Sequence, residues 1–286
     1  MAFTLIELLV VISIISVLMG ILLPVLAEAR RQTKALQCMS NQRQIFCAIN
    51  LFAADNDGCY PESMATITSG GSWHWQDPRM LTACRPRPGQ MHRSISEYLR
   101  DYIEDADIMF CPSAPEKYKY LQQSWDACDE WDNPESSFPY DPVWGTYCFY
   151  WNYIGYLGAG KSPFRGPRSP AGGRGYSKLL VSDYFGYDHH RSLKAYGSCE
   201  RFKRATITPG TEASSAYWSY KSNGHIGPDA LDIKLHTGYM DGHVESFTPS
   251  ETVPMRVSIT ADGSVPYPSG IGLGPGIFYL PLNGLR

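Results

Sequence analysis

Histidines and carboxylates are the side chains in this sequence best suited to hold a metal ion, because imidazole nitrogens and carboxylate oxygens are common ligands. No H-x-x-x-H pair occurs, and adjacent histidines on a strand would point to opposite faces. His236 and His243 flank an Asp241-Gly242 turn and can approach each other across it. A structural hydrogen-bonding role is the favoured interpretation, so no metal site is predicted. The weak candidates are Asp55, Asp57, His236, Asp241 and His243.

Cofactor motifs are equally weak. Asp55-Asn56-Asp57-Gly58 is similar to a calcium loop, but the EF-hand spacing and its distal Glu are absent, so a turn that ends a helix is favoured. Gly155 to Ser162 has phosphate-loop spacing, yet Pro163 prevents the helix that phosphate binding needs. No Ser/His/Asp or Cys/His catalytic set stands out. We therefore expect a protein that is not an enzyme, with calcium as the one cofactor left open.

Eight cysteines are candidates for disulfide bonds, and their pairing cannot be deduced because eight cysteines allow 105 connectivities. Cys38 and Cys47 lie about 13 Å apart along an expected helix and cannot bond each other. Disulfides persist outside the cytoplasm, where the N-terminal segment described next would place them. The candidates are Cys38, Cys47, Cys59, Cys84, Cys111, Cys128, Cys148 and Cys199.

The N-terminal segment from Phe3 to Leu26 is apolar except for one ionisable side chain, Glu7. As a helix it would span roughly 36 Å, enough for the hydrocarbon core of a bilayer. A secretory signal peptide is disfavoured, because the start is not basic and no Ala-x-Ala pattern follows Pro24. A carboxylate in such a segment is costly and usually has a partner and a function. An α-amino group, freed by cleavage before Phe3, is the nearest plausible partner.

The sequence from Phe3 to Val11, FTLIELLVV, resembles the processing segment of type IV pilins and type II secretion pseudopilins. The resemblance implies cleavage between Ala2 and Phe3 by a prepilin peptidase, methylation of Phe3, and a role for Glu7 in subunit docking. Ala2 stands where the family normally has Gly. Pro24 takes the place of the family's helix-kinking proline, and Gly20 lowers helix propensity further. The residues implied in assembly are Phe3, Glu7, Gly20 and Pro24.

Composition agrees with a membrane-anchored globular protein. The chain has 286 residues, of which 43% are hydrophobic, and a net charge of −3, so a nucleic-acid partner that needs a basic surface is not expected. We expect one helix over residues 3–54, apolar all round in 3–26 and amphipathic in 27–54. Its apolar positions there are Ala35, Met39, Ile45, Phe46, Ile49 and Phe52, with Gln42 as a gap in the pattern.

Residues 55–286 are expected to form a β-rich head, following a residual leader at 1–2 that is cleaved in the family. A capped helix is predicted at 94–103, and strands at 146–153, 178–182 and 277–280, the last at a sheet edge. Asp241-Gly242 predicts a hairpin between 232–240 and 243–247, and Asp262-Gly263 a second one. The segment 37–61 also resembles a group of pilin-like proteins of unassigned role, as does the hairpin. The fold class predicted is α+β, a long helix packed on an antiparallel sheet.

The function expected from the resemblance is that of a structural subunit of a type IV pilus-like filament. Its partners are copies of itself, the inner membrane before assembly, the prepilin peptidase and the assembly machinery, and its final location is the cell surface. A pseudopilin of a type II secretion system, located in the periplasm, is the first alternative, because it shares the same N-terminus. A membrane-anchored metal-binding protein or enzyme is the second.

Overall fold

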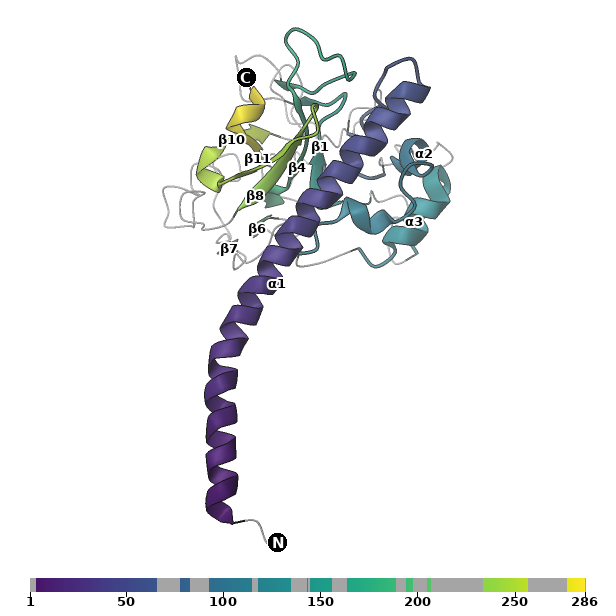
Figure 1. Ribbon diagram of the computed structural model, residues 1–286. Coiled ribbons are helices and arrows are strands. Elements are labelled where there is room, and N and C mark those ends of the chain that lie inside the picture. Colours follow the sequence, from purple (N-terminus) through teal and green to yellow (C-terminus); the bar gives the residue numbers. More distant parts are fainter. Residues whose placement is uncertain are drawn as a thin grey trace.

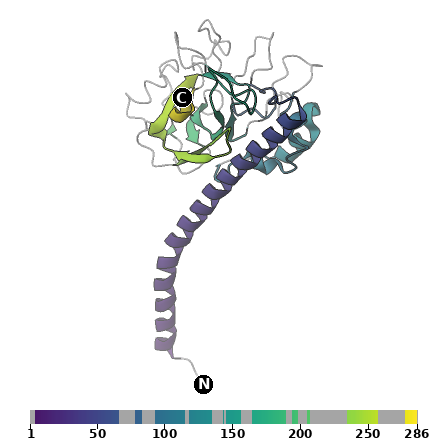
Figure 2. The ribbon, with the colours of Figure 1, turned by 45° about the horizontal axis from the view of Figure 1, so that its top comes forward.

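The computed structural model places one long helix, α1, partly against a globular head and partly outside it (Figures 1 and 2). It describes residues 4–65, 78–82, 93–114, 118–134, 143, 145–155, 164–188, 194–197, 205–206, 234–256 and 277–285. The N-terminal end of α1 lies far from the head, whereas the C-terminus lies within it. The fold is α+β, as predicted.

The helix α1 runs over Leu5–Asp55, close to the predicted 3–54, and continues through Pro24. Its C-terminal half lies between the sheet on one side and the segment of α2 and α3 on the other (Figure 1). Gly58 ends the helix with a positive φ of 73°, and its N–H donates to Ala53 O at 2.8 Å. This is a C-terminal capping bond of the kind that glycine favours, and it confirms that the helix ends in a turn, at 56–58.

The described residues of the head form three antiparallel sheets. The first has the order β1-β4-β8-β9 and packs against α1, the second has the order β10-β11-β5-β6-β7, and the third pairs β2 with β3. The strands are β1 Tyr147–Phe149, β2 Ile154–Gly155, β3 Phe164–Arg165, β4 Leu179–Asp183, β5 Phe185–Asp188, β6 Lys194–Gly197, β7 Ala205–Thr206, β8 Leu235–Tyr239, β9 Val244–Phe247, β10 Thr252–Arg256 and β11 Ile277–Pro281.

Short helices cover the opposite side of α1. They are α2 Ser96–Leu99, α3 Leu121–Ala127 and the 3-10 helices η1 Ala106–Met109 and η2 Cys128–Glu130. Two further 3-10 helices lie on the side of the sheets, η5 Pro249–Glu251 directly before β10 and η6 Leu282–Leu285 directly after β11. The main core joins α1 to this side and to the first sheet, with Ile45 and Ile49 of α1 and Trp151 after β1 among its buried members. A second core contains Tyr150, Tyr153 and Leu280 together with residues of β4 and β8.

Two local predictions differ from the structure, and a third is confirmed. The helix predicted at 94–103 shortens to α2, and Ser94 Oγ accepts the N–H of Ser96 instead of capping a longer helix. The strand β11 is not at an edge, because β10 and β5 pair with its two sides. The Asp241-Gly242 hairpin is confirmed as β8–β9, with Gly242 at a φ of 86°. The second hairpin, at Asp262-Gly263, lies outside the described residues.

The packing of α1 on the head predicts that truncating a buried side chain of this helix destabilises the protein far more than truncating an exposed one. Ile45→Ala should lower the free energy of unfolding by about 2–5 kcal/mol, because Ile45 is fully buried and truncation leaves a cavity. Leu36→Ala on the exposed face should change it by less than about 0.5 kcal/mol. Chemical denaturation of the full chain in detergent, followed by tryptophan fluorescence, measures both. Equal effects of the two substitutions would contradict this packing.

Candidate functional site

The N-terminal part of α1 exposes apolar side chains on every side. All residues from 4 to 34 are exposed, among them Leu5 at 81% and Leu23 at 64%. The hydroxyls of Ser13 and Ser16 donate to the carbonyls of Leu9 and Ile12, each at 2.7 Å, so these donors turn back onto the helix. The segment is long and apolar enough to cross a membrane, and it is compatible with membrane anchoring or a signal sequence.

Glu7 has a local partner that the sequence analysis missed. Thr4 N and Thr4 Oγ1 donate to Glu7 Oε2 at 2.9 and 2.7 Å, and Glu7 N donates to Thr4 Oγ1 at 3.3 Å. This reciprocal arrangement is a capping box, which satisfies backbone donors at the helix start. The signal was present, since Thr4-Leu5-Ile6-Glu7 has the S/T-x-x-E spacing. Ala2 and Phe3 lie outside the described residues.

A buried polar cluster joins α1 to the first sheet. The carboxylate of Asp183, at the end of β4, is 0% exposed. Its Oδ1 accepts from Cys38 Sγ at 3.1 Å and from Gln42 Nε2 at 3.3 Å, both on α1. Its Oδ2 accepts from the backbone N–H of His236 on β8 at 2.7 Å and lies 3.0 Å from His236 Nδ1. One carboxylate therefore connects three elements that lie far apart in the sequence.

Neighbouring groups complete this cluster. Gln42 Nε2 also donates to His236 O at 3.2 Å, and Tyr147 Oη of β1 donates to Cys38 Sγ at 3.4 Å. Burial first, and then the nearby Cys38, raises the pKa of Tyr147 well above its usual range, so this phenol keeps its proton. Gln42 Oε1 is buried and accepts no hydrogen bond from the described residues. Gln42, predicted as a gap in the apolar pattern of the helix, is thus fully buried.

Of the predicted metal candidates, the structure brings only Asp241 and His243 into contact with each other. His236 pairs with Ser246 across the hairpin, whereas the exposed His243 lies at the turn, where Nδ1 contacts Asp241 Oδ1 and the ring stacks on Tyr239. Asp55 accepts the hydroxyl of Tyr102 at 2.7 Å. Asp57 adopts a positive φ of 51° in the turn after α1. Cys38, Asp183 and His236 form the metal-capable cluster instead, with their ligand atoms all within 4.8 Å of one another.

The cysteines that the structure describes form no disulfide with one another. Cys47 and Cys59 are exposed, Cys128 is half-buried, and Cys38, Cys111 and Cys148 are buried. Cys84 and Cys199 lie outside the described residues.

Gly20 and Pro24 lie in the exposed part of α1, where a Cβ at Gly20 would meet nothing within 4 Å.

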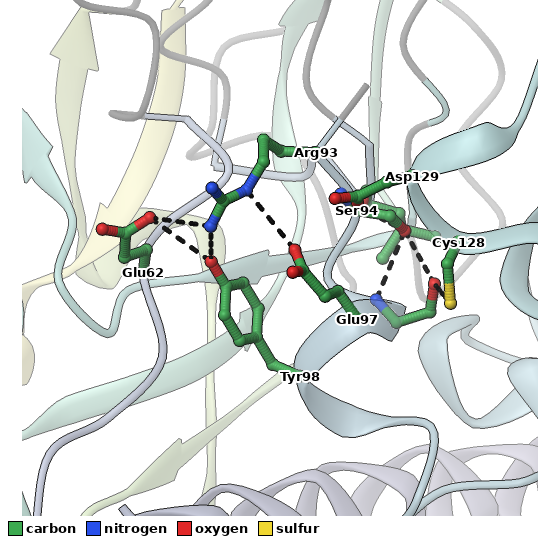
Figure 3. Close-up of polar contacts among 9 residues, drawn as sticks. Glu62, Arg93, Ser94, Glu97, Tyr98, Cys128 and Asp129 are labelled. Atoms are coloured by element: carbon green, nitrogen blue, oxygen red, sulfur yellow. Dashed lines mark hydrogen bonds and ion pairs between the residues drawn. The ribbon is translucent and has the colours of Figure 1, made fainter. Parts of the chain in front are cut away.

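A second polar cluster lies on the side of α2 and η2 (Figure 3). Arg93 contacts Glu62 at 3.2 Å and Glu97 at 3.4 Å, and it also contacts the hydroxyl of Tyr98. Asp129 Oδ1 accepts the backbone N–H of Ser94 at 2.6 Å. These contacts tie the segment after α1 to the short helices. The ion pairs are partly exposed and form a surface network rather than a reaction centre.

Comparison with known proteins gives no match: no family model, no curated protein and no solved structure is significantly similar to this chain.

Asp183→Ala should lower the free energy of unfolding by about 3–5 kcal/mol, because it leaves buried donors on α1 and β8 without their acceptor. Asp241→Ala removes the same side chain from an exposed site and should cost less than about 1 kcal/mol. Denaturation of the full chain in detergent compares the two variants. A small loss in Asp183→Ala would mean that this cluster does not hold α1 on the sheet.

The network around Arg93 predicts a pH effect at Glu97. Burial, and then the hydrogen bond and charge of Asp129, raise the pKa of Glu97. The folded chain keeps this proton to a higher pH than the unfolded chain, so the free energy of unfolding falls as the pH rises through that interval. Glu97→Gln removes this dependence. The free energy of unfolding of Glu97→Gln minus that of the wild type should increase as the pH is raised from about 4, near the ordinary pKa of Glu, to about 7. A constant difference would contradict the raised pKa.

Proposed function

We propose that the chain is a structural subunit of a type IV pilus-like filament and assembles through the N-terminal half of α1. The observation that carries the proposal is the helical segment 4–26, which exposes apolar side chains on all sides and has Glu7 as its one ionisable group. Such a surface is stable only when lipid or other apolar helices surround it. A lipid bilayer covers it in the precursor, and the same segments of neighbouring subunits cover it in the filament.

The rest of the fold suits this arrangement. The apolar segment projects from the head, so subunits can bundle their helices without their heads colliding at the axis (Figure 1). The head then faces outward and forms the filament surface. The resemblance of residues 3–11 to pilin processing segments supports cleavage before Phe3 and methylation of that residue. The precursor is inserted in the inner membrane, and the assembled subunit is at the cell surface.

Glu7 has two roles in this proposal. In the single subunit its carboxylate caps α1 through Thr4. In the filament it pairs with the α-amino group of Phe3 in an adjacent subunit, because an unpaired carboxylate among apolar helices is costly. The first role needs only a hydrogen-bond acceptor, whereas the second needs a negative charge. Substitutions that separate acceptor from charge therefore separate the two roles.

Glu7→Gln should abolish filaments while the subunit still accumulates in the membrane, because Gln can complete a capping box but carries no charge. Thr4→Ala removes the cap, keeps the charge and should still assemble. Glu28→Gln is the matched control, since Glu28 is an exposed acid on the same helix with its own partner, Arg31. Electron microscopy of shed filaments and membrane fractionation measure the outcome.

Normal filaments from Glu7→Gln would contradict the charge-pairing role of Glu7. A wild-type chain that stays monomeric in the membrane, with no filament on the cell surface, would contradict the proposed function itself. Mass spectrometry of the N-terminus of the assembled subunit tests the processing step, with a methylated Phe3 as the expected first residue.

A further inference from the structure

We propose that Cys38, Asp183 and His236 bind a divalent transition metal, with zinc as the best fit, at the junction between α1 and the first sheet. A thiol, a carboxylate and an imidazole are the three ligand types that zinc sites in proteins use. Here one of each comes from α1, β4 and β8, and all three residues are buried. Calcium fits poorly because it prefers oxygen ligands.

The spacing of the three ligand atoms is close to what a tetrahedral ion requires. Around zinc, sulfur, nitrogen and oxygen ligands lie about 2.0–2.3 Å from the metal, so they lie roughly 3.3–3.7 Å from one another. Cys38 Sγ is 3.1 Å from Asp183 Oδ1, and His236 Nδ1 is 3.0 Å from Asp183 Oδ2. These two contacts use different oxygens of Asp183, and one ligand atom from each of the three residues lies within 4.8 Å of the other two, so small side-chain movements admit the ion.

Charge balance favours an ion at this place. The carboxylate of Asp183 is completely buried, and His236 supplies a positive charge beside it only when its imidazole is protonated. Metal binding replaces the thiol proton of Cys38, which leaves to solvent, with a metal–sulfur bond. It also uses the Nδ1 lone pair of the neutral imidazole. One divalent ion then neutralises one thiolate and one carboxylate, so no net charge remains buried.

Gln42 lies beside the three ligands and offers its amide oxygen as a fourth. Its Oε1 is buried and accepts no hydrogen bond from the described residues, which is costly for an amide oxygen. The other end of the same amide lies 3.3 Å from Asp183 Oδ1. Amide oxygen and nitrogen are assigned from their surroundings, and a half-turn exchanges them. With a metal bound, the exchanged amide gives up its hydrogen bond to His236 O, places its oxygen toward the ion and completes a closed, four-coordinate site.

The expected consequence is mechanical rather than catalytic. A closed zinc site fastens the part of α1 at Cys38 to β4 and β8, and the binding free energy adds to the stability of the fold. The inference does not depend on filament assembly, because all of the ligands come from one chain.

Purified full-length chain in detergent tests the site directly. After incubation with zinc chloride and gel filtration, we expect about one zinc per chain by elemental analysis. Cys38→Ser and His236→Ala should each weaken zinc affinity by at least tenfold, since loss of an outer partner of a metal ligand alone costs that much. The matched controls are Cys47→Ser and His243→Ala, an exposed cysteine on the same helix and an exposed histidine after the same strand; both should retain the metal.

A cobalt measurement on the wild-type chain keeps the test valid if a ligand variant fails to fold. Cobalt bound at this site should give a near-ultraviolet charge-transfer band from the Cys38 thiolate and the intense visible bands of a four-coordinate ion. A folded wild-type chain that retains no zinc, or a cobalt complex without the thiolate band, would overturn the proposal. Folded Cys38→Ser or His236→Ala that binds zinc as tightly as the wild type would also overturn it.

Discussion

A buried carboxylate must have its oxygens satisfied, and this requirement at Asp183 determines how α1 sits on the head. The side chain accepts hydrogen bonds from α1 and from the backbone of β8 while belonging to β4. Apolar packing of Ile45 and Ile49 supplies most of the attraction, but it is non-directional. The polar contacts of Asp183 are directional, and so they specify the rotation and register of the helix on the sheet.

The two halves of α1 are one continuous helix with opposite requirements. Near the head, buried positions recur on one face, and polar side chains such as Asn41 and Gln42 make specific contacts there. Towards the N-terminus no face is covered, and the serine hydroxyls bond to the helix itself. The head therefore holds the C-terminal half of the helix, whereas the N-terminal half needs an apolar environment from outside the subunit. This division is the basis of the proposed assembly.

Periodicity and turn chemistry were sufficient to predict α1, the turn at Gly58 and the β8–β9 hairpin, because these depend on residues near one another in sequence. The capping role of Glu7 is also local, since the Thr4-Leu5-Ile6-Glu7 spacing indicates it, but the carboxylate was assigned to an α-amino group instead. The cluster around Asp183 could not be predicted in this way. Cys38 lies 145 residues from Asp183, which lies 53 residues from His236, and no local spacing connects them. The interior position of β11 in its sheet likewise depends on pairing with distant β5.

The length of α1 outside the head has a mechanical consequence. Leu5 and Cys38 are separated by about 50 Å along the helix axis. A sideways force at the N-terminal tip therefore acts on the head with a lever arm about twice the length of the buried stretch of α1 from Cys38 to Ala53 that resists it. The greatest torque falls on the first turns of α1 that touch the sheet, and these are the turns that carry Cys38 and Gln42.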